Sequence, residues 1–190
     1  MADASTTQAP ATGGQAVKRS IARVIIFEIL SLGLYQFYWF YQTRGVVSRA
    51  IGGNDQVGLQ TLGLIVPILN IFIAYWLLRD VDKFNRAAGG QGLPLSPLWM
   101  ILIPLIMAFI PFVNFLAGIV ALVFYIIVLM RLNEGLDKQG ATDAPYTMGE
   151  IATVVVGLLL GVAYFALLGS LLNSAAHNSS VNVNTSTYWY

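Results

Sequence analysis

Apolar residues in this chain gather into five long runs separated by short polar stretches. The runs are close to the roughly 20 residues that a helix needs to cross about 30 Å of hydrocarbon. Charged side chains fall mostly between the runs rather than within them. The pattern therefore predicts five helices, over residues 24–43, 59–78, 97–111, 114–130 and 151–172.

Two of these helices share one uncharged stretch, from Pro97 to Met130. That stretch is too long for a single crossing of a bilayer. Pro111-Phe112-Val113-Asn114 stands near its centre, and a Pro and an Asn close together favour a turn. We expect two helices joined by a tight turn there.

The two ends of the chain are polar. Residues 1–17 are rich in Ala, Thr, Gln and Gly, and we predict a disordered N-terminal tail. Residues 173–190 form a polar C-terminal tail without Lys or Arg, in which Asn178 and Asn184 each begin a glycosylation pattern. The alternation over Val181–Asn184 suggests a strand, but disorder is the favoured interpretation. The helical transmembrane domain then occupies residues 18–172.

Composition changes the picture from a soluble domain to a membrane protein. Apolar residues make up 57% of the chain and charged residues only 10%, which is too little charge to cover a soluble surface. The predicted fold class is an all-α polytopic membrane protein of about five transmembrane helices between two disordered tails. Its first partner is the lipid bilayer.

The same composition excludes several functions. The net charge is +1 and no basic tract suits phosphates, so we expect no nucleic-acid partner. The chain has no Cys, and its single His177 lies in the polar tail. No zinc cluster or Ser-His-Asp triad can be built from these residues. We therefore predict no enzyme, no metal site and no cofactor.

Basic residues suggest a topology. With five crossings, eight of the ten Lys and Arg residues face the cytoplasm, which puts the protein in the cell membrane with its N-terminus inside and its C-terminus outside. Arg44 and Arg49 are the exceptions. In a rival topology segments 24–43 and 59–78 re-enter, bending at Gly33 and Pro67, and that loop stays cytoplasmic. We favour five crossings, because irregular backbone inside a membrane needs protein cover.

Three polar residues lie inside the apolar runs. Glu28 is an intramembrane acid, for which ion or proton coupling is the functional hypothesis. Pairing with Arg23 or Lys18 near the interface is the favoured alternative. Asn70 and Asn114 each follow a Pro by three residues, and we expect them to cap helices or to bond between helices rather than to bind a ligand.

The two Pro-Asn motifs belong to an internal echo. Pro67-x-x-Asn70 returns as Pro111-x-x-Asn114, and the charged exit that begins at Arg79 returns at Arg131. The interval from the Asn of the motif to the Arg of the charged exit is longer in the second copy. This difference predicts a mid-membrane kink at the first motif and a surface turn at the second. Duplication and coincidence both remain open as explanations.

Two sets of residues favour particular packing. The aromatics of the first run predict an interfacial belt, with stacking on a ligand as the alternative. Small residues repeat every four positions in the last run, which lets helices approach closely, either within the chain or with a second copy or another membrane protein. The aromatic set is Tyr35, Tyr38, Trp39 and Tyr41, and the small-residue set is Gly149, Thr153, Gly157 and Gly161.

The aromatic run carries a family resemblance. Ser31 to Tyr41 reads Ser-Leu-Gly-Leu-Tyr-Gln-Phe-Tyr-Trp-Phe-Tyr, and the Pro67-x-x-Asn70 segment follows with Tyr75-Trp76. This resembles a bacterial and archaeal family of small membrane proteins catalogued as domain of unknown function 4234, over about residues 20–90 with a weaker echo to about residue 140. The family shows Thr and Ile where this chain has Ser31 and Leu34. The resemblance implies a prokaryotic, multi-pass inner-membrane protein and no reaction.

Three functions are compatible with these patterns. The favoured hypothesis is a non-enzymatic membrane protein that acts by assembly or partner binding. The first alternative is a small transporter or channel component that uses Glu28 and the helix of Pro67 and Asn70. The second alternative is a membrane-shaping protein with wedge-like hairpins, which requires the re-entrant topology.

Overall fold

A computed structural model describes residues 17–53 and 56–184, with the backbone alone over 177–184. The described part is all-helical apart from two short strands. Its elements are β1 (Val17–Lys18), α1 (Ile21–Leu30), α2 (Tyr35–Ala50), α3 (Val57–Gly63), α4 (Pro67–Ala87), α5 (Pro97–Phe109), α6 (Asn114–Lys138), β2 (Thr142–Asp143) and α7 (Met148–Asn184).

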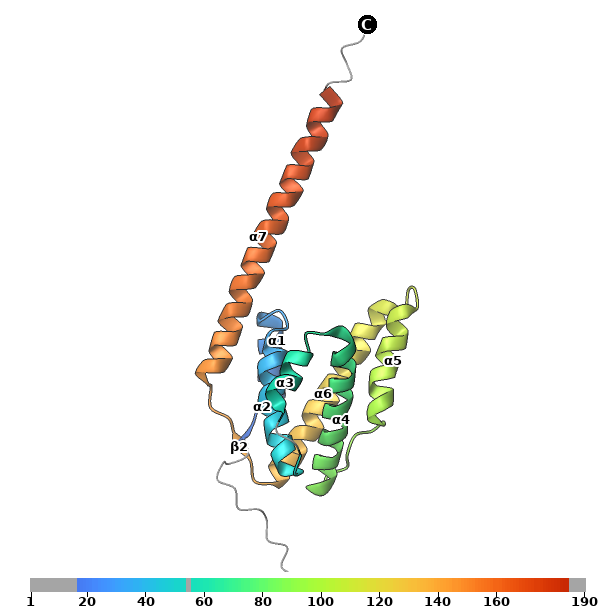
Figure 1. Cartoon of the computed structure of the whole chain (residues 1–190), viewed down its shortest axis with the longest axis vertical. Helices are drawn as coiled ribbons and strands as arrows, with labels where there is room; N and C mark the ends of the chain where they lie inside the picture. Colours follow the sequence, from blue (N-terminus) through green and yellow to red (C-terminus); the bar gives the residue numbers. More distant parts are fainter. Residues whose placement is uncertain (1–16, 54–55, 185–190) are drawn as a thin grey trace, which may run out of the picture.

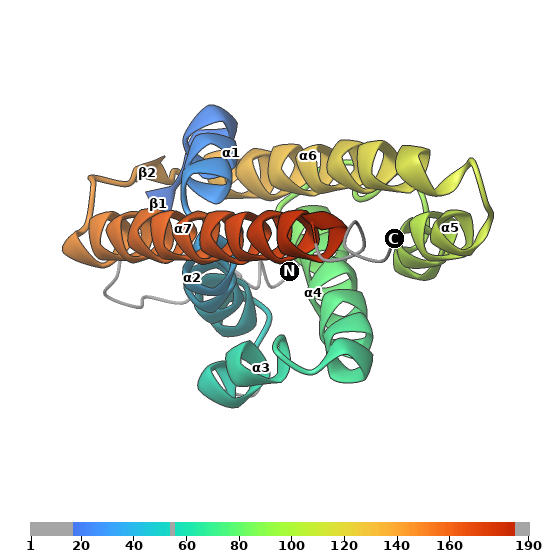
Figure 2. The same cartoon turned by 90° about the horizontal axis from the view of Figure 1, so that it is seen from above.

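The first six helices form three hairpins whose turns lie on the same side of the molecule (Figure 1). We call these turns, residues 31–34, 64–66 and 110–113, the tips. The final helix α7 leaves the bundle beside α1 and α2 and extends far beyond the tips, leaning over them (Figures 1 and 2). Five transmembrane helices are therefore not supported, because each of the first two predicted segments is broken into a hairpin.

The first tip is closed by backbone geometry. Leu32 has φ 51° and Gly33 has φ 90°, in the left-handed region that ends helices. The Gly33 N–H donates to the carbonyl of Glu28 at 2.9 Å, and the Leu34 N–H donates to the carbonyl of Ser31 at 3.2 Å. Because a Gly adopts positive φ at no steric cost, the chain reverses here, as the re-entrant topology proposed.

The second tip follows from a proline. Pro67 is the first residue of α4, where its missing N–H breaks no helical bond, and Val66 before it is extended. The expected kink inside a continuous helix is wrong, since α3 ends at Gly63 and α4 begins afresh at Pro67. The third tip agrees with prediction: α5 ends at Phe109 and α6 begins at Asn114.

Helix α7 contains the whole of predicted segment 151–172 and continues to Asn184. The prediction of disorder, and the suggestion of a strand, are therefore wrong for residues 173–184. Polar side chains enter the helix without breaking it: Ser170 and Ser174 donate to the carbonyls of Leu167 and Ser170 at 2.8 and 2.9 Å. Residues 1–16 and 185–190, and the side chains of Asn178 and Asn184, lie outside the described residues.

The core lies where the three hairpins converge, in the half of the molecule away from the tips. Val81 and Phe84 of α4 and Leu129 and Leu132 of α6 are almost fully buried there. In the same half, β1 pairs in parallel with β2, which ties the start of the chain to the segment before α7.

Candidate functional site

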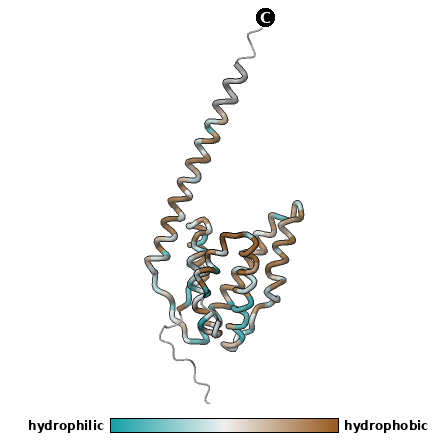
Figure 3. The backbone as a smooth tube through the Cα atoms, in the orientation of Figure 1, coloured by the Kyte–Doolittle hydropathy of each residue, from teal (hydrophilic) through white to brown (hydrophobic). Residues whose placement is uncertain are grey.

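Apart from Glu28, the charged residues that the structure describes lie in one half of the molecule. All ten Lys and Arg residues lie at the helix ends away from the tips or in the segments that join those ends, and so do the described acidic residues other than Glu28. Figure 3 shows that hydrophilic residues gather in this half and that mostly hydrophobic residues lie toward the tips. We call it the charged half. Arg44 and Arg49, the exceptions in the five-crossing topology, belong to it because α2 runs back from the first tip.

The tips expose large apolar side chains instead. Phe112 is 93% exposed, Ile65 67% and Leu32 60%. Leu62, Ile68 and Phe109 beside them are also exposed. Large exposed apolar side chains in this number on a soluble protein would mark an interaction site or an aggregation hazard. The described surface is therefore suited to an apolar environment on the tip side.

The small residues of α7 pack within the chain. A Cβ added at Gly157 would lie 2.5 Å from the Cα and the carbonyl oxygen of Ser31, and one at Gly161 would lie 2.6 Å from the Leu32 side chain. A Cβ added at Gly149 would lie 2.9 Å from the Tyr38 ring. These glycines let α7 touch the α1–α2 hairpin. Thr153, the fourth member, donates its hydroxyl to the carbonyl of Gly149 at 2.8 Å.

A buried carboxylate fastens the other end of this contact. Glu150, in the first turn of α7, is fully buried and accepts from Arg19 Nε at 2.8 Å and from the Tyr35 hydroxyl at 2.7 Å. Arg23 completes the set with an ion pair to Glu150. The backbone N–H of Thr147 donates to the same carboxylate at 3.1 Å. Donors from four residues therefore compensate the buried charge and fix where α7 leaves the bundle.

Arg23 also holds the segment that precedes α7. Its guanidinium donates to the carbonyls of Ala144 at 2.6 Å and Pro145 at 2.9 Å, and it lies 3.9 Å from the centre of the Tyr146 ring. On the edge of the same region, Lys18 pairs with Asp137 at 2.5 Å. This hydrogen bond raises the pKa of Lys18.

A second buried ion pair joins the first two hairpins. Arg44 of α2 pairs with Asp80 of α4, and both side chains are less than a tenth exposed. Arg44 Nε also donates to Gln60 of α3 at 2.7 Å, and Arg79 Nε donates to Asp80 at 3.2 Å. Arg44 is thus a structural link between three helices.

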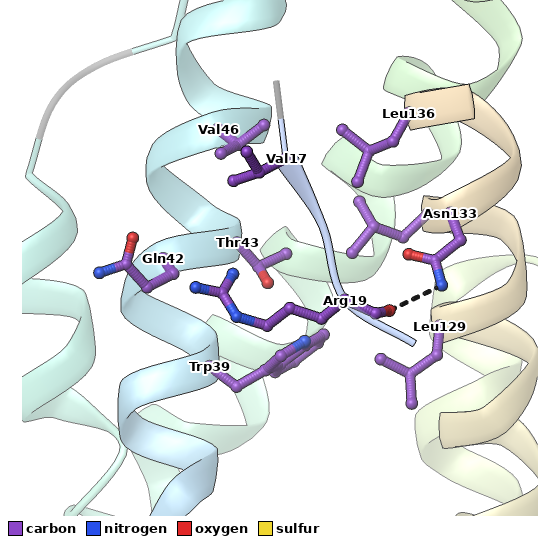
Figure 4. Close-up of a pocket in the computed structure, with 10 residues that line it drawn as sticks. Val17, Arg19, Trp39, Gln42, Thr43, Val46, Leu129, Asn133 and Leu136 are labelled. Atoms are coloured by element: carbon purple, nitrogen blue, oxygen red, sulfur yellow. Dashed lines mark hydrogen bonds between the residues drawn. The ribbon is translucent and has the colours of Figure 1, made fainter. Parts of the chain in front are cut away.

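A small hollow lies beside Arg19 in the charged half. Its walls come from β1, α2 and α6, and the backbone carbonyl of Arg19 accepts from the Asn133 amide at 2.9 Å (Figure 4). Its volume of about 20 Å³ is close to that of one water-sized probe. The hollow is therefore too small for a substrate.

A much larger cavity, of about 540 Å³, lies between α2, α4, α5 and α6. We call it the interhelical cavity. Aliphatic and aromatic side chains line most of it, and Gln36, Asn70, Tyr125 and the Trp39 indole bring the polar atoms. Small residues leave the space open, namely Ala74, Ala108, Ala117, Gly118 and Ala121.

The polar residues expected in the apolar runs do not meet in one place. Glu28 forms no pair with Arg23 or Lys18, since those cations bind Glu150 and Asp137. Its Oε2 is buried with no hydrogen-bond partner among the described residues. Asn70 lies in the first turn of α4 and lines the interhelical cavity, whereas Asn114 begins α6 at the third tip.

The aromatic residues divide between core and surface. Tyr35 and Trp39 are 0% and 3% exposed, inside the bundle rather than in a belt around it. Tyr38 shares a hydrogen bond of 2.7 Å with Thr147, and Tyr41 is half exposed. Of the four aromatic residues, only Tyr41 is exposed enough for an interfacial belt. Tyr35 and Trp39 face inward because α2 begins at Tyr35, after the first tip, and packs against its neighbouring helices.

Sequence reasoning missed the importance of Glu150. The sequence did contain a signal for this site. Glu150 is the one acid at the start of the longest apolar run, and two arginines come just before the first run. What the pattern lacked was the hairpin that brings Arg19, Arg23 and Tyr35 to the same place.

No family model, curated protein or solved structure matches this chain. The resemblance in Ser31–Tyr41 therefore stays a prediction. Two described helices are long and apolar enough to cross a membrane, namely α6 and the Met148–Ala176 part of α7. A membrane location is compatible with these two helices.

Proposed function

We propose that this protein inserts its three hairpins into one leaflet of a bilayer from the cytoplasmic side, crosses the bilayer once with α7, and acts by shaping the membrane. The observation that carries the proposal is that all three tips are apolar and exposed while every Lys and Arg lies in the opposite half. The protein is not an enzyme in this proposal.

The charge distribution supports this topology over five crossings. Five crossings leave Arg44 and Arg49 outside, whereas three hairpins keep all ten basic residues on one side. Retention of Lys and Arg on the cytoplasmic side is the usual rule for membrane proteins. The favoured orientation keeps β1 inside and the end of α7 outside.

For the first hairpin, depth supports insertion into a single leaflet. The apolar run of α7 from Ile151 to Leu172 is about 33 Å long at 1.5 Å per residue, enough for one crossing. Gly157 and Gly161, which face the first tip, lie only about 9 and 15 Å along this run. The first hairpin would thus reach about the middle of the hydrocarbon and turn back.

The turns inside the membrane have the cover that such a topology needs. Non-helical backbone at membrane depth is tolerated where its polar groups are satisfied within the protein. At the first tip the N–H groups of Ser31, Leu32, Gly33 and Leu34 all donate to backbone carbonyls at 2.9 to 3.2 Å. The Ser31 hydroxyl donates to the Glu28 carbonyl at 3.2 Å. The need of irregular backbone for protein cover, which favoured five crossings, therefore no longer counts against a turn at the first tip.

Asymmetric insertion is the physical basis for shaping. A helix about 10 Å across occupies about 80 Å² of a leaflet, so each hairpin adds about 160 Å² to the leaflet it enters. The other leaflet receives α7 alone among the described helices. An area difference of this kind bends the bilayer toward the cytoplasmic side as proteins accumulate.

Cysteine accessibility tests the topology, and the lack of native Cys makes labelling specific. Ala50→Cys, Thr142→Cys, Phe112→Cys and Asn173→Cys would be made singly and labelled with an impermeant thiol reagent on intact and lysed cells. We expect Ala50→Cys and Thr142→Cys to label only after lysis and Asn173→Cys to label on intact cells. Phe112→Cys should label in neither case. Labelling of Phe112→Cys or Ala50→Cys on intact cells would restore five crossings.

Vesicle shape tests the shaping activity itself. Purified protein would be reconstituted in vesicles, and vesicles with the hairpins in the outer leaflet would be separated from vesicles with the hairpins in the inner leaflet. We expect tubulation when the hairpins enter the outer leaflet. Phe112→Glu should weaken tubulation, because an acid near the bilayer centre costs about 2.5–3.5 kcal/mol. Gln139→Glu, at the charged end of the same hairpin, is the matched control. Round vesicles at every protein density, with the topology intact, would refute shaping while leaving the hairpins in place.

A further inference from the structure

We infer that the interhelical cavity is a binding site for the acyl chain of a membrane phospholipid. This inference rests on the proposed insertion of the hairpins, which puts the cavity at the depth of the hydrocarbon. It goes beyond that proposal by assigning a bound lipid to the protein rather than only a surrounding one.

The shape of the cavity suits a chain. It follows α6 from Ala117 to Val128, about 16 Å along the helix. Its volume of about 540 Å³ falls in the range of ligand pockets, which is roughly 300–1,000 Å³. An apolar space that extends this far along a helix is filled by a flexible hydrocarbon chain better than by a compact ligand.

The cavity is closed at the charged half and has exposed wall residues near the third tip. Leu77, Leu78, Met100 and Val128, which line it nearest the charged half, are each less than a tenth exposed. Residues of its wall nearer the third tip, Ala108, Gly118 and Ala121, are exposed. The opening therefore faces the region that the proposed function assigns to lipid tails.

Most of the cavity wall is aliphatic or aromatic and disfavours water, apart from the polar groups of Gln36, Asn70, Tyr125 and Trp39. Apolar cavities stay dry or take apolar ligands, and an empty space of this size forfeits dispersion contacts on every side. Gly118 lines the cavity, and a Cβ added there would meet no atom within 4 Å. A hydrocarbon occupant restores those contacts without a hydrogen bond.

Trp39 offers a direct reporter, because it lines the cavity and is 3% exposed to the surroundings. The other three tryptophans, Trp76, Trp99 and Trp189, would be changed to Phe in the full chain. The protein would be reconstituted in vesicles of phosphatidylcholine brominated in the middle of its chains, since bromine quenches indole fluorescence at contact. We expect strong loss of Trp39 fluorescence compared with vesicles of unbrominated lipid.

Filling the cavity should remove the quenching. Gly118→Leu places a side chain in the open space, and Ala121→Leu does the same from the rim. Gly169→Leu is the matched control, because Gly169 lies on α7 in open surroundings away from the cavity. We expect quenching of Trp39 to fall sharply in the two cavity variants and to persist in the control.

Two results would overturn the inference. The first is no quenching of Trp39 in the parent, as expected of a cavity filled by water or by a second copy of the chain. The second is equal quenching in Gly118→Leu, Ala121→Leu and the parent. A reporter at the third tip distinguishes failure of hairpin insertion from failure of the cavity to bind lipid. In a chain whose single tryptophan is introduced by Phe112→Trp, the tryptophan fluorescence should be quenched whenever the tip lies in hydrocarbon, whatever the cavity holds. Quenching at position 112 without quenching at Trp39 refutes the site and leaves the insertion standing.

Discussion

The contact between α7 and the first tip offers the sharpest test of this arrangement. Gly157→Ala adds one methyl group at a point 2.5 Å from two backbone atoms of Ser31, whereas carbon atoms prefer separations of about 3.5–4.0 Å. Backbone atoms cannot rotate away, so α7 must move by about 1 Å relative to the hairpin. We expect the overpacking to cost about 1–3 kcal/mol.

A matched variant removes the effect of helix propensity. Replacing a helical Gly by Ala stabilises the helix by up to about 1 kcal/mol wherever space allows. Gly169→Ala makes the same chemical change in the same helix, at a position where an added Cβ meets nothing within 4 Å. The difference between the two variants therefore isolates the contact with Ser31.

Thermal unfolding of the purified proteins in detergent measures that difference. A change of 1 kcal/mol shifts the melting temperature of a protein of this size by roughly 2–4 °C. We expect Gly157→Ala to melt several degrees below Gly169→Ala, which itself should equal or exceed the parent. If Gly157→Ala is as stable as Gly169→Ala, α7 does not pack on the first tip, and the use of α7 as a depth scale is refuted.

Two further substitutions test the fastening of the hairpins. Glu150→Gln should cost about 3–5 kcal/mol in denaturant unfolding, because it leaves two nearly buried guanidinium groups without their charge partner. Glu134→Gln removes a partly exposed acid from an ion-paired site and should cost less than about 1 kcal/mol, so equal losses would contradict the buried site. Gly33→Ala should destabilise the protein by about 1–2 kcal/mol, because Gly33 has φ 90°, which an L side chain disfavours. Gly45→Ala, inside α2 with open space around it, should be neutral or stabilising in the same assay, and a neutral Gly33→Ala would argue against the tight first turn.

The apolar pattern by itself determined three of the seven described helices. Segments 97–111, 114–130 and 151–172 correspond to α5, α6 and α7, because a long uninterrupted run of apolar residues forms a helix whatever it packs against. The turn before Asn114 was also legible, since Pro111 and the length of the uncharged stretch both demanded it. The charged exits at Arg79 and Arg131 marked helix ends in the same way.

The internal echo gains a meaning that its spacing did not provide. Pro67 opens α4 directly after the second tip, whereas Pro111 lies within the third tip and Asn114 opens α6, so both motifs stand where a hairpin turns back. Spacing had separated them into a kink and a turn, because it assumed that α4 crossed a bilayer. Both motifs stand at a turn between two helices, and the assumption about topology was the error.

Only the tertiary structure decided whether the first two apolar runs were crossings or hairpins. A run of 20 apolar residues has the same composition in both cases, and Gly33 permits a reversal without requiring one. What selects the reversal is the return of α2 beside α1, which brings Tyr35 to Glu150 and Arg44 to Asp80. These are contacts between residues far apart in the chain. A sequence pattern reports which side chains avoid water, whereas the direction of each helix depends on where its buried polar groups find their partners.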